Sequence, residues 1–364
     1  RMTPFVLARY LTWRFLLSCG AVAAALAAFV FIINLAELLN RSAGKDEMTF
    51  GIALAMSVFK LPLTLNKLLP FIVLFGAIWM FARLARFHEL EAIRASGVSA
   101  WQFIAPPVAV AILAGVASTL AINPIAANAA SQFEQLEARY LRGRVSILAA
   151  LPTGVWLRQA DESGQAVIHA LRVSSSDMRL EDVIVFIYQG ADRFVRRINA
   201  RSAVLEEGRW RLSEAYESRP GEPSVLHETY DLPTRLTADE VRDSFTSPDT
   251  IDFWDLPRFI ATAEDAGFTA VRHRMHFYAL IALPLALGAM VVIAAAFALR
   301  PMRFGGTGQL LAAAAGVGFV FYFFSDFTEA LGLSGLVSPI IAAAAPTLTC
   351  ALCGVTALLY LEDG

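Results

Sequence analysis

Two cysteines near the C-terminus, Cys350 and Cys353, form a C-x-x-C pair, which is a spacing used by metal sites and redox centres. Both cysteines lie inside a long apolar run, and no histidine is near them in the sequence. The third cysteine, Cys19, also lies in an apolar run. Cysteines in such surroundings are typical of small packing residues, so we interpret the pair as structural rather than as ligands.

Other patterns that could support chemistry are also incomplete. His273 and His276 are three residues apart, but two ligands alone do not make a zinc site. The glycine-rich stretch GGTGQLL, residues 305–311, lacks the G-x-x-x-x-G-K-[ST] pattern of a nucleotide-binding loop. The sequence also has no G-x-S-x-G nucleophile motif. We therefore expect a chain that is not an enzyme and has no metal or cofactor of its own.

Basic side chains beside the apolar runs could bind a phosphate group, because arginine and lysine suit its charged oxygens. A charge deep in a membrane costs on the order of 3 kcal/mol, so it usually faces a cavity or a polar partner. The alternative is that these residues reach the membrane surface or form salt bridges to acidic neighbours such as Glu37 and Glu137. The candidates for headgroup binding are Arg41, Lys45, Lys60, Lys67, Arg139 and Arg142.

A compact charged segment, HELEAIRASGVSAWQF (residues 88–103), separates two long apolar runs. Phe87, Leu90 and Ile93 recur every three residues, so they share one face of a short helix. The charged residues lie largely on its other faces. We expect a short helical elbow at about residues 84–97.

Two features mark the end of this elbow. Gly97 suits the left-handed conformation that ends a helix. Ser99 and Gln102 then fit a capping box that begins the next helix. Two interpretations stay open from physics alone: a solvated turn whose charges mark one side of a membrane, or a rigid coupling helix docked in a groove of a partner. The glycine stop and the new cap favour a rigid shape, which force transmission would need.

The composition indicates a membrane protein. Of the 364 residues, 57% are hydrophobic and 17% are charged, and the mean hydropathy of +0.55 is too high for an ordinary soluble domain. A net charge of −2 provides no basic field for nucleic acid, and we expect no such partner. A spanning helix needs roughly 20 apolar residues. Charge-free runs predict six spans at residues 15–36, 68–82, 95–133, 275–299, 304–325 and 330–361, of which the second is interrupted by basic residues just upstream.

Basic residues gather between alternate runs, and the positive-inside rule makes that side cytoplasmic. Both termini are then cytoplasmic, and the long central segment lies outside. These basic residues are Arg9, Arg14, Arg83, Arg86, Arg94, Arg300 and Arg303.

The central segment, residues 134–250, differs in kind from the rest. Its β-rich runs, such as QAVIHALRV and EDVIVFIYQ, are separated by turn signals such as DESG and SRPGEP. After it, Pro248 is predicted to start a capped interfacial helix that returns to the membrane. The predicted fold is α-helical, with six transmembrane helices and an inserted periplasmic all-β domain, a sandwich or jelly roll. Its parts are a first membrane half (1–133), the β domain (134–250), and an interfacial helix with the second membrane half (251–364).

At HELEAIRASGVS the elbow resembles the cytoplasmic coupling helix of the lipopolysaccharide export permeases, the LptF/LptG (YjgP/YjgQ) family. The resemblance covers essentially the whole chain: FVLARYL at the start, TGVWLR at the first external strand, and SPDTIDFWDLPRFI before the fourth span. The tail YFFSDFTEALGLSGLVSPIIAAAAPTLTC is similar to the LptG branch. The order of these motifs along one chain makes the match specific.

The resemblance implies a permease subunit of an ABC transporter in the Gram-negative inner membrane. Its partners would be an LptF-like paralogue, a dimer of an LptB-like ATPase that binds ATP and Mg, and an LptC-like single-span protein. The complex would extract lipopolysaccharide from membrane lipids and pass it to a periplasmic β-jelly-roll bridge. The elbow would carry the ATPase motion, with Glu89 as a polar contact and Leu90 and Ile93 in a groove of the ATPase. The implied coupling residues are Glu89, Leu90, Ile93, Arg94 and Gly97.

The resemblance also implies lipid sites. Arg41 and Arg139 match basic positions of LptG-like permeases, which makes them the better headgroup candidates. In the family, spans one and five of the two paralogues form lateral gates. Aromatic residues on these spans could line a gate, although such residues more often pack or face lipid. The candidates are Phe29, Phe31, Phe319 and Phe321.

Two rival classes of protein fit the sequence less well. One is a different ABC-type membrane component, such as a lipoprotein-release or mechanotransmission subunit, which usually has four spans, and the six predicted spans argue against it. A membrane-anchored scaffold, whose external β domain binds other envelope proteins without transport, would need neither a rigid elbow nor basic residues beside a cavity. Replacing Glu89 by lysine separates the classes, because only the transport interpretation predicts a loss of ATPase association or export.

Overall fold

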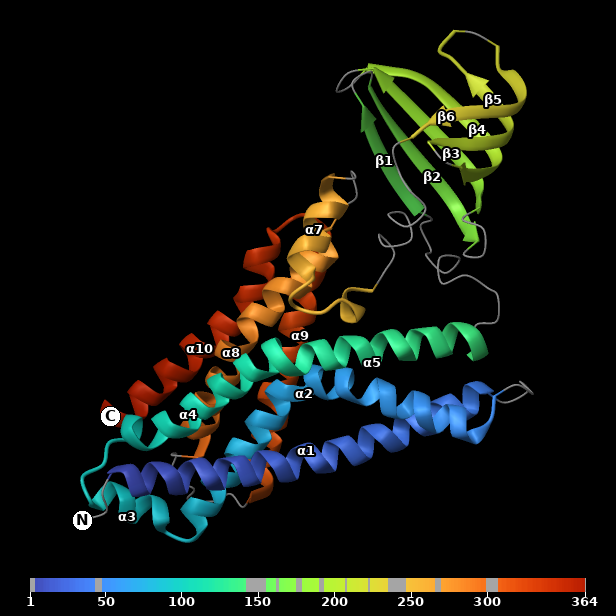
Figure 1. The fold of residues 1–364 in the computed structure, drawn as a ribbon. Helices are drawn as coiled ribbons and strands as arrows, with labels where there is room; N and C mark the ends of the chain where they lie inside the picture. Colours follow the sequence, from blue (N-terminus) through green and yellow to red (C-terminus); the bar gives the residue numbers. More distant parts are fainter. Residues whose placement is uncertain are drawn as a thin grey trace.

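The computed structural model describes residues 4–42, 48–141, 155–161, 164–174, 179–189, 193–206, 208–221, 223–234, 247–265, 270–298 and 307–363. These residues form a bundle of long helices and one β-sheet (Figure 1). Both chain ends lie at the end of the bundle that carries the short helix α3, and the sheet lies beyond the opposite end (Figure 1). The expectation of a helical protein with an inserted β domain is confirmed.

The first half of the bundle contains three long helices. Helix α1 spans Pro4–Ser42, α2 spans Phe50–Arg86, and the short α3 spans Glu89–Ala95. The third long helix is continuous through two π-helical turns. Its parts are α4 (Ala100–Ala117), η1 (Ser118–Ile122), α5 (Asn123–Leu136) and η2 (Glu137–Leu141).

This third helix corrects the expected start of the β domain. We predicted that the domain begins at residue 134, yet the helix continues to Leu141. The reason is local, because the segment QFEQLEARYL contains good helix formers and has no glycine or proline to stop it. The first charged residues after the apolar run therefore mark where the helix leaves the apolar layer. They do not mark where the helix ends.

The second half begins with a short surface helix. We expected Pro248 to start it, but Pro248–Thr250 forms only a single 3-10 turn, η4. Helix α7 begins later and spans Leu256–Asp265. Asp252 explains the shift, because its Oδ1 accepts a hydrogen bond from the backbone N–H of Asp255 at 2.9 Å, as an N-cap does.

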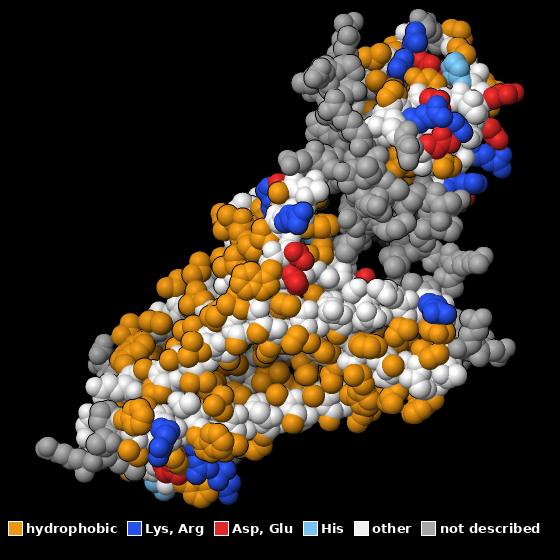
Figure 2. Space-filling model, viewed as in Figure 1, with side chains coloured by type: hydrophobic (Ala, Val, Ile, Leu, Met, Phe, Trp, Pro, Cys, Tyr) orange, Lys and Arg blue, Asp and Glu red, His pale blue; other side chains and the backbone are white. Residues whose placement is uncertain are grey.

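Three more long helices follow: α8 (Val271–Ala298), α9 (Thr307–Leu333) and α10 (Pro339–Asp363). Among the described residues, 5 helical stretches are long and apolar enough to cross a membrane: α1, α2, α4 with its continuation, α8 and α10. Helix α9, with 27 residues, occupies the place of the remaining predicted span. The side chains along the bundle are largely apolar, and charged ones gather at the α3 end and over the sheet (Figure 2). This distribution suits a multi-pass membrane protein.

Small residues let the helices pack closely. A Cβ added to Gly115 on α4 would lie only 2.5 Å from the Cα of Pro284 on α8, so only glycine fits there. The main core joins α2, α4 and α8 through large buried side chains, among them Phe81, Phe103 and Leu287. A second, smaller core around Leu38, on α1, joins α1 and α2 to the far end of the third helix. The two cores support the two sites described below.

The inserted domain is one antiparallel sheet in which every strand pairs with its neighbour along the chain. The six strands are β1 (Val155–Asp161), β2 (Gly164–Ser174), β3 (Arg179–Gln189), β4 (Arg193–Glu206), β5 (Arg209–Ser218) and β6 (Val225–Pro233). We expected a sandwich or jelly roll, whose strands also pair with distant ones. Within the described strands the order is instead a simple meander, because short connections favour pairing between successive strands.

A line of irregular residues crosses this sheet. Asp182 on β3 and Glu214 on β5 have left-handed backbones, with φ of 54° and 51°. The strand pairing skips both residues and also skips Arg201, which lies between them on β4. The register is the same on both sides of these positions, so no strand gains a residue there. The pairing of β3 with β4 does shift its register between Ile187 and Tyr188, and a bulge of that kind bends a strand and increases its twist. The sheet buries its own core around Trp210, which is 1% exposed.

Candidate functional sites at the two ends of the bundle

The elbow has the sharp boundaries that the sequence predicts. Helix α2 ends at Arg86, and His88 turns the chain with a left-handed φ of 57°. Gly97, with φ of 86°, ends α3 as expected. The capping box is also confirmed, since Ser99 Oγ accepts from the Gln102 N–H at 3.3 Å and Gln102 Oε1 accepts from the Ser99 N–H at 3.2 Å. The elbow is therefore a defined turn, helix and restart.

The inner face of α3 packs against its own chain. Leu90 is 7% exposed and belongs to the main core, and Ile93 packs against that core. This corrects the expectation that Leu90 enters a groove of a partner, because the bundle already covers its side chain. Phe87 does not share this face, since it precedes the turn at His88 and is 61% exposed. Sequence periodicity placed it on α3 because a turn formed by a non-glycine residue has no strong signal.

Glu89 is held by a contact that the sequence does not reveal. Tyr10 Oη on α1 donates a hydrogen bond to Glu89 Oε2 at 2.7 Å, and Arg14 Nε donates to Tyr10 Oη at 3.1 Å. All three side chains are partly buried. The contact fixes the start of α3 to α1, in addition to its covalent connections to α2 and α4. The implied contact of Glu89 with a partner stays a prediction. The partner would have to share the Glu89 carboxylate with Tyr10.

The outer face of α3 is open. Glu91, Ala92, Arg94 and Ala95 are exposed there, and His88 Nδ1 lies 3.1 Å from Glu91 Oε2. Arg94 is therefore accessible to a partner, as the implied role requires. Glu91 has the same accessibility and was not among the predicted coupling residues.

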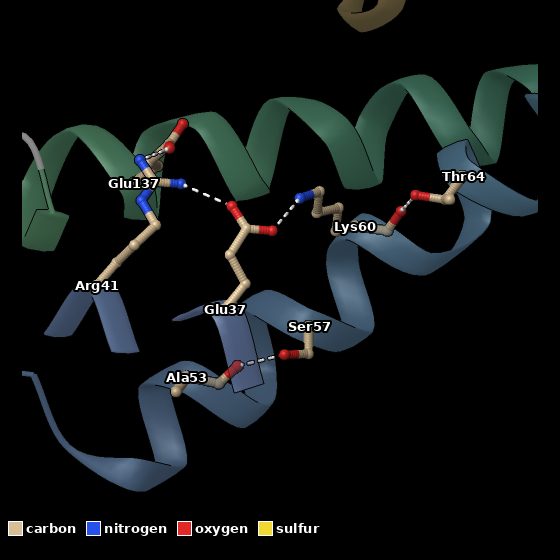
Figure 3. A network of polar contacts seen from close by, with 7 residues as sticks. All are labelled: Glu37, Arg41, Ala53, Ser57, Lys60, Thr64 and Glu137. Carbon is tan, nitrogen blue, oxygen red and sulfur yellow. Dashed lines mark hydrogen bonds and ion pairs between the residues drawn. The ribbon is translucent and has the colours of Figure 1, made fainter. Parts of the chain in front are cut away.

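A second polar site lies at the opposite end of α1 (Figure 3). Arg41 Nη2 binds Glu137 Oε1 at 3.0 Å, and Arg41 Nη1 lies 3.5 Å from Glu37 Oε1. Lys60 Nζ on α2 lies 3.6 Å from Glu37 Oε2 and sits over the ring of Phe133 at 5.6 Å. The four charged residues join α1, α2 and η2 above the smaller core and together carry no net charge.

Arg41 and Lys60 thus form the salt bridges to acidic neighbours that were the alternative to headgroup binding. These salt bridges do not remove them from a headgroup site, because the side chain of Arg41 is 43% exposed and keeps further N–H donors. Arg139, two residues after the buried Glu137, is exposed and lies over the ring of Tyr140 at 5.5 Å. Predicted site residues Lys45 and Arg142 lie outside the described residues.

Lys67 belongs to a different cluster. Its Nζ lies 2.5 Å from Asp249 Oδ2, and His276 Nδ1 on α8 lies 3.8 Å from Asp249 Oδ1. Neighbouring His273 packs against the ring of Phe259, with centroids 4.6 Å apart, so the two histidines face different groups. The cluster attaches the chain leaving the β domain to both halves of the bundle.

The predicted gate residues lie on two helices, α1 and α9. Phe29 on α1 is 61% exposed and Phe319 on α9 is 68% exposed, whereas Phe31 and Phe321 are partly buried. Phe321 lines an apolar cavity of about 540 Å³ between α8, α9 and α10. Helix α2 contacts both α1 and α9. Their role as a gate between two chains stays a prediction.

Comparison with known proteins gives matches along nearly the whole chain. A model of the family described as "Lipopolysaccharide export system permease LptF/LptG" matches residues 9–360. The chain is 24% identical over 328 residues to the "Lipopolysaccharide export system permease protein LptG" of Haemophilus influenzae, covering 87% of this chain and 88% of that protein. It is 25% identical over 310 residues to the protein of the same name from Escherichia coli K12, covering 83% of each.

Proposed function

The chain belongs to the lipopolysaccharide export permease family LptF/LptG, and from this we propose that it is the LptG-like membrane subunit of an ABC transporter that extracts lipopolysaccharide. It is a multi-pass, non-catalytic membrane protein. We place it in the Gram-negative inner membrane with both termini and α3 in the cytoplasm and the β domain in the periplasm. The extracted lipid would pass to a periplasmic β-jelly-roll bridge.

The energetics of extraction require partners. Removing an acyl chain from a bilayer costs about 0.8 kcal/mol per methylene, or roughly 11 kcal/mol for a fourteen-carbon chain. Lipopolysaccharide carries several such chains, so the work needs an external energy source. We propose that an LptB-like ATPase dimer, with its own ATP and Mg, supplies it. An LptF-like paralogue would complete the lipid cavity, and an LptC-like single-span protein would join the pair.

The observation that carries this proposal is the rigid attachment of α3. The helix is only 7 residues long, yet a turn at His88, a glycine stop at Gly97 and a capping box at Ser99 define both of its ends. The hydrogen bond from Tyr10 adds a third attachment, to α1. A push on the exposed face of α3 would therefore move α1, α2 and α4 together. A scaffold that acts through its external domain has no use for this construction.

We further propose that the basic site at the far end of α1 binds a lipid phosphate. Arg41 and Arg139 would donate to it, with Lys60 held nearby by Glu37. Because Glu37 and Glu137 already neutralise Arg41 and Lys60, an incoming phosphate would have to compete with these carboxylates. Such competition favours reversible contact, which a transporter needs in order to release its substrate.

Native mass spectrometry of the tagged chain, extracted gently from its own envelope, tests the proposal. Copurification of a paralogous permease, two ATPase copies and lipopolysaccharide would support it. A lone chain, or one with only periplasmic partners and ordinary phospholipid, would favour the scaffold, provided that a control transporter keeps its subunits. Replacing Glu89 by lysine adds a second criterion, because loss of the ATPase is expected from a coupling helix and not from a scaffold.

A further inference from the structure

A small cavity lies beside the elbow, between α1 and α2. Its volume is about 130 Å³, roughly that of four water molecules at ~30 Å³ each, so it suits a group of a few heavy atoms. It differs from the outer basic site, which lies at the other end of α1. The cavity is lined by Tyr10, Arg14, Leu17, Trp79, Arg83 and Glu89, among others.

The cavity has an excess of positive charge. Arg14 is half-buried and Arg83 is exposed, and neither forms an ion pair in the part of the chain that the structure describes. The only carboxylate in the lining, that of Glu89, accepts its hydrogen bond from Tyr10 rather than from an arginine. Arg14 uses its Nε for Tyr10 and stacks over that ring at 5.2 Å, which leaves its terminal N–H groups available. Two guanidinium groups against one carboxylate leave a net charge of about +1 to be balanced.

The remaining walls are apolar except for Ser18, and they are open to the side. Leu17 is 51% exposed and Trp79 is 52% exposed, and each lies about one helical turn inside the bundle relative to the arginine of its own helix. Tryptophan with arginine at a helix end is typical of the boundary between acyl chains and headgroups. Basic pockets between spanning helices at such a boundary suit anionic lipid headgroups.

We propose that this cavity binds the phosphodiester of an anionic phospholipid from the surrounding membrane. Arg14 and Arg83 donate to the phosphate oxygens, and one acyl chain lies along Leu17 and Trp79. Because Arg14 also donates to Tyr10, which in turn donates to Glu89, the bound phosphate would stabilise the attachment of α1 to the elbow. The inference requires only that these helices cross a membrane, and it does not depend on lipid export.

Native mass spectrometry of the full-length chain in detergent tests this site. The protein is titrated with phosphatidylglycerol, or with phosphatidylcholine of the same acyl chains, which keeps the phosphate but has no net charge. The test variant is R14Q/R83Q. The matched control is R9Q/R86Q, which removes one exposed arginine from the same end of each of the same two helices. Thermal unfolding of both variants checks that each is folded.

We expect wild type and R9Q/R86Q to retain phosphatidylglycerol equally. Each arginine near an anionic membrane surface is expected to strengthen lipid binding about fivefold. Retention of phosphatidylglycerol by R14Q/R83Q should therefore fall roughly twentyfivefold. The double lysine variant, R14K/R83K, should recover most of the binding because it restores the charge. Phosphatidylcholine should bind wild type several-fold more weakly.

Four results would overturn the proposal. Equal loss in R9Q/R86Q would mean that general surface charge holds the lipid. Equal retention of phosphatidylcholine would mean that the apolar walls alone hold it. Full displacement by millimolar inorganic phosphate would identify a site for a soluble anion. Unchanged lipid binding in R14Q/R83Q, with loss of a copurifying protein, would assign the arginines to a carboxylate of that partner.

Discussion

Replacing Tyr10 by phenylalanine tests whether a single hydrogen bond holds the elbow to α1. The variant removes only the Oη that donates to Glu89 Oε2 at 2.7 Å, and the ring remains to pack. A hydrogen bond to a charged group contributes about 1.5–3 kcal/mol. Glu89 is half-buried, so solvent screening favours the lower value of about 1.5 kcal/mol. That free energy corresponds to about a tenfold rise in the local opening equilibrium of α3.

Hydrogen–deuterium exchange measures this opening directly. The informative amides are those of Ala92, Ser96 and Gly97, whose N–H groups are bonded within the elbow. They should exchange about tenfold faster in Tyr10→Phe, while the amides of the β domain keep their rates. In Glu89→Gln, which keeps an acceptor but loses the charge, we expect an intermediate increase of about threefold.

The matched control is Tyr322→Phe on α9, whose side chain is exposed at 60%. It should leave exchange in the elbow unchanged. Unaltered exchange in Tyr10→Phe would refute the reasoning, because the covalent connections and the Leu90 contact would then suffice to hold α3. In the assembled transporter, the same variant should lower the lipid extracted per ATP hydrolysed.

Three further predictions concern the bundle and its sites. Gly97→Ala leaves free space around the new Cβ but forces alanine to a φ of 86°, which costs about 1–2 kcal/mol of backbone strain. We therefore expect the variant to couple ATP hydrolysis to export less well, and unchanged coupling would contradict this. Gly115→Ala should lower the melting temperature, because its Cβ would lie 2.5 Å from Pro284 and overpacking costs about 1–3 kcal/mol, whereas Gly20→Ala, with open space around it, should not. Arg41→Gln should reduce the lipopolysaccharide that copurifies, and Arg201→Gln, which breaks an exposed ion pair of the β domain, should leave it unchanged; equal effects would argue against a headgroup site at Arg41.

Local features were predicted well because they depend on residues only a few positions apart. The stop at Gly97 and the cap from Ser99 to Gln102 involve backbone groups within one turn of each other. The long apolar helices follow from composition alone, since a membrane leaves the backbone no other partners. Two of the predictions that were wrong also concern local competition. Asp252 displaced Pro248 as the start of the surface helix, and polar residues after 134 continued a helix.

Features that join distant segments could not be predicted from one sequence. Tyr10 and Glu89 are 79 residues apart, and Lys67 and Asp249 are 182 apart. No periodicity or motif relates such positions, because their contact depends on the rotation and depth of two helices that pack by shape. The same packing decided that Leu90 faces inward and that Arg14 and Arg83 share a cavity without a carboxylate partner.

By itself, the sequence determined that this chain is a multi-pass membrane protein with an inserted β domain and a capped helical elbow. Hydrophobic length, turn chemistry and capping are short-range properties, and each acts within a few residues. The tertiary structure alone decided which charges meet, which stay unpaired and which face of the elbow is free. Those outcomes depend on how the helices pack, because a side chain contributes to a site only through the neighbours that packing places around it.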